Sequence, residues 1–123
     1  MYRLSSAQSL QASLASAITT NNVTVTVSYY DVPSQSKPDF SEYRGATENT
    51  SVSGTTAVTI LDAPAQGTQR DVDLIVVYNA DTVATTVTVI LDESGTDYPQ
   101  RKATLNAEDS LVWTPESGWN TVT

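Results

Sequence analysis

The strongest constraint on the fold is a regular alternation of β-branched and polar residues in several short segments. In Val23–Tyr29, valine or tyrosine fills every second position, and threonine or serine fills the positions between. Successive side chains of a strand point to opposite faces, so this spacing predicts a strand with one buried face. The same alternation recurs over Val83–Leu91. These two segments indicate an all-β domain.

The remaining apolar segments extend this pattern to seven or eight strands, separated by turn residues about every ten positions. We therefore expect an antiparallel β-sandwich of jelly-roll or Ig-like type, with a single domain over residues 9–123 and a flexible arm over residues 1–8. The expected strands are residues 9–18, 23–29, 55–61, 71–78, 83–91, 98–105, 110–114 and 119–122.

The first of these segments is open to two interpretations. Leu10, Leu14 and Ile18 recur with the spacing of a helix stripe, whereas Leu10, Ala12 and Leu14 also alternate as in a strand. Its serines weaken a helix, and its neighbours are β, so we favour a strand.

The segment 71–78 is apolar on both faces. Simple alternation places Val72, Leu74, Val76 and Tyr78 on one face and Ile75 and Val77 on the other. A strand of this kind is central in its sheet, or its outer face is covered by a partner. Ile75 and Val77 are therefore candidate interface residues.

Residues 31–53 are polar and contain two prolines before Gly45, which predicts one long loop. Loops of such length in compact domains are commonly functional or make contacts. Phe40 and Tyr43 are candidate interface residues within it. Tyr30 is a further candidate, because Tyr29 and Tyr30 are consecutive and one of them must point outward.

The chain contains no cysteine and no histidine. This excludes disulfides, zinc–thiolate sites and thiol nucleophiles, and it removes the commonest general base and transition-metal ligand. A serine nucleophile would need Lys37 or Lys102 as its base, and nothing in the sequence indicates that either is activated. We expect no enzyme and no cofactor.

Acidic pairs are the remaining candidates for chemistry. They lie in turns or at strand starts, where acidic residues are ordinary surface groups, so neither glycoside hydrolysis nor a resident metal is expected. A surface calcium site at Asp71 and Asp73 or at Asn79 and Asp81 stays open. The candidate carboxylate pairs are Asp92/Glu93, Glu108/Asp109 and Asp71/Asp73.

The net charge of −8, from 14 acidic and 6 basic residues, disfavours both nucleic acid and an anionic membrane surface as partners. The opening residues lack the apolar stretch of a secretory signal. No window reaches the length of a transmembrane helix.

Trp113 and Trp119 flank a tight turn, Pro115–Gly118. Exposed together with Tyr30, they would form a stacking platform for a sugar. A buried pair at one end of a sandwich is the interpretation that we favour.

The order of several motifs resembles that of small β-sandwich structural proteins in the virions of tailed bacteriophages. The likeness extends over residues 9–122, and its motifs shape a fold rather than an active site. They are a Thr-Gln-Arg that opens Thr68–Asn79, the strand Thr86–Asp92, the Lys-x-Thr-Leu and acidic-Ser-Leu of Lys102–Trp113, and Gly118-Trp119.

The resemblance implies a virion component that is assembled in the cytoplasm of a bacterial host. It favours a capsid decoration, or cement, protein that binds the major capsid protein or other virion proteins and stabilises the capsid surface, with a homotrimer as the favoured state. The alternative is a small tail, head–tail or fibre module involved in host or carbohydrate attachment.

Overall fold

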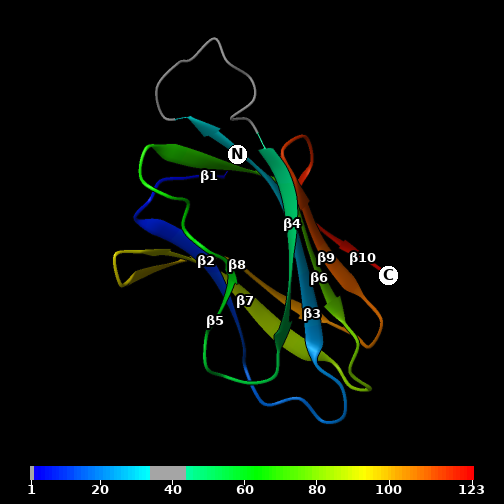
Figure 1. Ribbon diagram of the computed structural model, residues 1–123. Helices are drawn as coiled ribbons and strands as arrows, with labels where there is room; N and C mark the ends of the chain where they lie inside the picture. The colour runs from blue at the N-terminus through cyan, green and yellow to red at the C-terminus, as the bar shows by residue number, and fades with distance from the viewer. Residues whose placement is uncertain (1, 34–43) are drawn as a thin grey trace.

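The protein is described by a computed structural model that covers residues 2–33 and 44–123. Within these ranges the chain forms ten strands in two antiparallel sheets that pack face to face (Figure 1). The predicted all-β sandwich is confirmed. The strand count is slightly higher than expected because two strands, β1 and β4, were not predicted.

The larger sheet, sheet A, is built on the long central strand β6 (Thr68–Asn79). Its order is β10 (Gly118–Val122), β9 (Ser110–Thr114), β6, β3 (Val23–Pro33) and β4 (Arg44–Val52). The short β1 (Arg3–Leu4) pairs with the first half of β6, and β9 pairs with the second half. Sheet B has the order β5 (Val58–Leu61), β2 (Gln8–Leu14), β7 (Thr85–Glu93) and β8 (Thr96–Leu105).

The core lies between the two sheets and is formed by alternate residues of each strand. Val23, Val25 and Val27 of β3 are buried, and the threonines between them point outward. In β2, Leu10, Ala12 and Leu14 are buried, which confirms the strand over the helix for this segment. The other fully buried apolar side chains include Ile60, Leu61, Val87, Val89, Leu105 and Leu111.

A β-bulge in β6 changes which of its residues face the core. Ser28 pairs with Leu74 and Tyr29 pairs with Val72, so Asp73 is an extra residue with no partner on β3. Val72 points inward before the bulge, and Ile75 and Val77 point inward after it, both fully buried. The predicted grouping was wrong for Val72, which shares the inward face with Ile75 and Val77, whereas Leu74, Val76 and Tyr78 share the outward face as predicted.

The polar segment 31–53 contains a strand where a loop was expected. Strand β4 pairs with β3 from Arg44 opposite Asp31 to Val52 opposite Val23, and within residues 45–52 only Val52 is buried in the core. The strand lies at the edge of sheet A, where most of its side chains meet solvent, so it lacks an apolar pattern. Phe40 and Tyr43 lie outside the described residues.

Residues 2–4 are docked on the domain rather than loose. The side chain of Leu4 is buried in the core, and the Val72 N–H donates a 2.9 Å hydrogen bond to the Tyr2 carbonyl. Strand β1 fills the part of the β6 edge that β9 leaves unpaired. Two residues are too short to show alternation, which is why the sequence predicted an arm.

The turns match the sequence. Strands β7 and β8 form a hairpin through Ser94 and Gly95, whose φ angles of 50° and 90° are those of the turn type that suits the twist of a hairpin. Pro99 lies in β8, an edge strand of sheet B, as expected for a residue without an N–H.

Among the described residues no helix has the length and apolar character needed to span a membrane.

Candidate functional site

The most highly organised polar group is the carboxylate of Asp81, at one end of the sandwich. Asp81 follows β6 on the crossing to sheet B, and it accepts four backbone hydrogen bonds. Three come from the β2–β3 connection, from the N–H groups of Thr19 at 2.7 Å, Thr20 at 2.8 Å and Asn21 at 3.1 Å, and the fourth comes from Thr82 at 2.8 Å. These donors lower the pKa of Asp81 from 3.8 to about 2. The carboxylate thus holds together two connections that both cross between the sheets.

Asn79 lies beside this group and is fully buried. Its amide nitrogen donates to the carbonyls of Val83 at 2.9 Å and Leu105 at 3.0 Å, and its side-chain oxygen accepts from the Asp81 N–H at 3.0 Å. Asn79 and Asp81 are the pair that could have served a surface calcium ion. Their oxygens instead accept hydrogen bonds from the protein's own backbone.

Three aromatic residues, Tyr2, Trp113 and Trp119, gather near the end of β9 that lies away from Asp81. Trp113 and Trp119 face each other across β9 and β10, and the ring of Tyr2 lies 4.8 Å from that of Trp113. The Trp119 indole N–H donates a 3.3 Å hydrogen bond to the Tyr2 hydroxyl, and burial raises the pKa of this phenol. Trp113 is only 5% exposed. Trp113 is therefore buried as expected, whereas Trp119 is only partly buried against the core, and the two do not form a platform with Tyr30.

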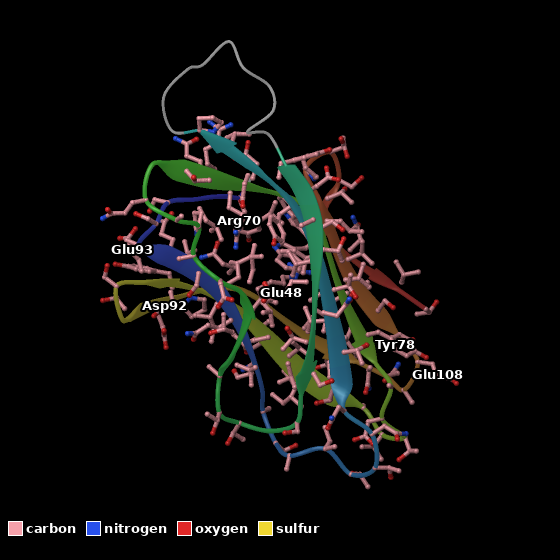
Figure 2. All side chains as sticks on the ribbon, viewed as in Figure 1. Glu48, Arg70, Tyr78, Asp92, Glu93 and Glu108 are labelled. Carbon is pink, nitrogen blue, oxygen red and sulfur yellow. The ribbon has the colours of Figure 1, made fainter. Side chains whose placement is uncertain are left out.

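The side chain of Arg70, near the start of β6, lies at the edge of the core between the two sheets (Figure 2). Its guanidinium makes two hydrogen bonds to the Asp31 carboxylate, at 2.7 and 2.9 Å, and one of 2.8 Å to the Asp62 carbonyl. The group also lies 4.3 Å from the centre of the Tyr29 ring. The hydrogen bonds to Asp31 raise the pKa of Arg70. In Figure 2 Arg70 and Glu48 lie between the two sheets, and Glu48 accepts a 3.4 Å hydrogen bond from the Asp62 N–H.

The candidate carboxylate pairs lie on separate parts of the domain, and one member, Asp109, is buried. Asp71 forms a two-bond ion pair with Arg3, at 2.7 and 3.0 Å, and Glu93 accepts a 2.7 Å hydrogen bond from the side chain of Gln8. Asp109 accepts from the Asn106 N–H at 3.2 Å. Within residues 2–33 and 44–123, no three acidic side chains lie close enough to hold a metal ion together.

The predicted interface residues do not form one surface. Ile75 and Val77 are in the core, and Tyr30 is 50% exposed on the outer face of sheet A. The apolar residues that β6 does present on this outer face are Leu74, Val76 and Tyr78. Figure 2 shows Tyr78 on the side of sheet A that faces away from sheet B.

Sequence reasoning missed the roles of Asp81 and Arg70. The Asn79-Ala-Asp81 turn was visible as turn chemistry. The partners of Asp81 lie about sixty residues earlier in the chain, so no local spacing could have revealed them.

Comparisons of this chain with protein-family models, with curated proteins and with solved structures gave no match. The assignment of function therefore depends on the residues themselves and on the resemblance in motif order.

Proposed function

We propose that this protein is a structural component of a tailed bacteriophage particle, and specifically a capsid decoration protein that binds and stabilises the outer surface of the capsid. Its partners are the major capsid protein and further copies of itself, with a trimer as the state implied by the resemblance. In this proposal the domain contributes contacts and carries out no catalysis.

One observation carries the proposal: the residues that carry the resemblance hold the sandwich together. Arg70 of the Thr-Gln-Arg motif bonds to Asp31, and Asn79 connects the strand ends around Leu105. Trp113 and Trp119 pack against each other and Tyr2. Among the described residues, every buried side-chain nitrogen or oxygen has a hydrogen-bond partner. A likeness of this kind supports a shared architecture, and the role in assembly is proposed by analogy with the family that the motif order resembles.

The contact with the capsid is proposed to lie at the end of the domain that carries Tyr30 and β1. Tyr30 is half-exposed and lies next to Gly45, where an added Cβ would be 3.6 Å from the tyrosine ring. The ring is therefore supported from one side and presents the other outward. Exposed tyrosines supported in this way are common at protein interfaces.

The alternative role in host or carbohydrate attachment is less well supported. Sugar stacking would need Trp113 and Trp119 on the surface, and Trp113 is almost entirely covered. A glycan array probed with the isolated domain would test this directly. Specific binding to a sugar would favour the fibre or tail module over the decoration protein.

The decisive experiment is to locate the polypeptide in an electron-microscopy map of the intact particle and to count its copies. Copies distributed over the capsid lattice would support the proposal. Copies confined to the tail or connector would replace it with the tail module, and absence from purified particles would overturn both. A Tyr30→Ala variant should bind undecorated particles less well than the wild type, while a Tyr98→Ala variant, which removes an equally exposed tyrosine from sheet B, should bind normally.

A further inference from the structure

The outer face of sheet A carries no charged side chain across its central part. Paired residues on adjacent strands share a face, so the registers define three rows that cross the sheet. One row runs through Ser51, Thr24, Tyr78, Ser110 and Val122, the next through Asn49, Thr26, Val76, Val112 and Asn120, and the third through Thr47, Ser28 and Leu74. We call these three rows the neutral face.

The middle of the neutral face is apolar. Val76 and Val112 are adjacent partners on β6 and β9, and both are partly exposed. Tyr78 and Val122 lie in the neighbouring row and are 36% and 52% exposed. Exposed apolar residues that adjoin one another in this way mark interaction surfaces.

The charges around this surface are placed outside it. Asp73 and the Arg3–Asp71 ion pair lie beyond the Leu74 row, and Glu108 lies in the turn beyond Tyr78, where its N–H bonds to the Asn79 carbonyl. The outer face of sheet B differs, because Asp92 and Asp97 oppose each other across its hairpin and Lys102 opposes Thr88. Of the two outer faces in the described structure, the neutral face is the uncharged one.

We propose that the neutral face is where one copy of this chain binds a second copy across a two-fold axis, a contact separate from the three-fold contact of the trimer that the resemblance implies. A chain with a net charge of −8 repels its copies wherever carboxylates meet. In a two-fold contact each patch faces the same patch of its partner, so any charge within it would oppose itself. A face without charges and with an apolar centre avoids this cost and gains from burial. A partner of opposite charge would instead be expected to bind the acidic surfaces.

The size of the neutral face sets the strength of the contact. Five strands about 4.8 Å apart, with three rows about 6.8 Å apart, give a flat area on the order of 500 Å². Standard interfaces bury roughly 800 Å² on each partner, so we expect a pair that forms at high protein concentration. On a particle surface, where copies are held close together, the same contact would be strengthened.

The test uses two matched threonine substitutions on the purified protein. Thr24→Glu places a carboxylate on the neutral face, and Thr88→Glu places one on the outer face of sheet B next to Lys102. Sedimentation velocity over a concentration series should show that the wild type and Thr88→Glu each associate to a species of twice the mass. Thr24→Glu should weaken association by about tenfold or more, because two like charges would meet.

A second measurement uses the absence of native cysteine. Val76→Cys and Thr88→Cys each create a single thiol. Under mild oxidation Val76→Cys should form the disulfide-linked dimer faster, because its thiols are brought together at the contact. A wild type that stays monomeric at the highest concentration, equal effects of the two glutamates, or equal rates of disulfide formation would overturn the proposal. None of these results depends on the particle, so they leave the proposed capsid role to its own test.

Discussion

At the scale of single residues, the sandwich depends on a few polar side chains that satisfy backbone groups where the chain crosses between the sheets. Asp81 is the clearest case, since one carboxylate accepts four N–H groups from two separate connections. Asn79 serves the neighbouring carbonyls in the same way. A buried backbone N–H or C=O group without a hydrogen-bond partner lowers the stability of the fold. Asp81 and Asn79 supply these partners at the connections between the sheets.

The lowered pKa of Asp81 predicts a specific dependence of stability on pH. The carboxylate titrates at about 2 in the folded state and near 3.8 when unconstrained. Its contribution is therefore fully present above pH 4 and is lost as the pH falls towards 2. Urea unfolding of the wild type and of Asp81→Asn, measured from pH 5 to pH 2, should show a difference in stability that shrinks over this window.

The control for this prediction is Asp97→Asn, because Asp97 is exposed in the β7–β8 hairpin. It should not reproduce the loss of stability at pH 5. If Asp81→Asn and the wild type lost stability in parallel down to pH 2, the carboxylate would not be the group responsible.

At the scale of elements, the bulge in β6 decides which side chains enter the core. Deleting Asp73 would remove the extra residue and restore regular pairing with β3, and Val72, Ile75 and Val77 would stay inward. The deletion variant should therefore still fold cooperatively, as monitored by circular dichroism and thermal melting, whereas one residue inserted between Leu74 and Ile75 should turn Ile75 and Val77 outward and prevent cooperative folding. The substitution Asp73→Ala keeps the residue count and should change stability by about 0.5 kcal/mol or less. A deletion variant that cannot fold would show that the bulge itself is required.

The docking of β1 makes a second prediction at this scale. Leu4 is 1% exposed, so Leu4→Ala should lower the free energy of unfolding by about 2–5 kcal/mol through lost burial and a cavity. Arg3→Ala, which removes a mostly exposed side chain next to it, should change stability little. Chemical denaturation followed by tryptophan fluorescence measures both, because Tyr2 packs on Trp113. A near-neutral Leu4→Ala would mean that the segment behaves as the loose arm first expected.

The sequence predicted most elements but not their exact faces. Strands with a buried side, such as β3 and β7, were clear from alternation alone. Strand β4 was missed because an edge strand with polar residues on both faces has no apolar period. The phase change at Asp73 was missed because a bulge appears only once the partner strand is known. The contact of Asp81 with Thr19–Asn21 was out of reach for the same reason, because it is defined by the packing of distant segments.

At the scale of the whole molecule, charge controls how copies behave towards one another. The isoelectric point is about 4.1, so lowering the pH to this value removes the net negative charge that separates the molecules. Solubility should reach a minimum near this pH while circular dichroism still reports a folded sandwich, because the Asp81 carboxylate remains ionised there. Light scattering and circular dichroism on the same samples test this. Unfolding that accompanies precipitation would contradict it.

The aromatic cluster of Tyr2, Trp113 and Trp119 affects how the chain folds while it is synthesised on the ribosome. It joins the first strand of the chain to the last hairpin, across a separation of 117 residues. Tyr2 leaves the exit tunnel early, but the surface that it packs against is delivered only after β9 and β10 have been translated. Strand β1 can pair with β6 earlier, but the Tyr2 ring stays without its aromatic partners until synthesis has passed Trp119.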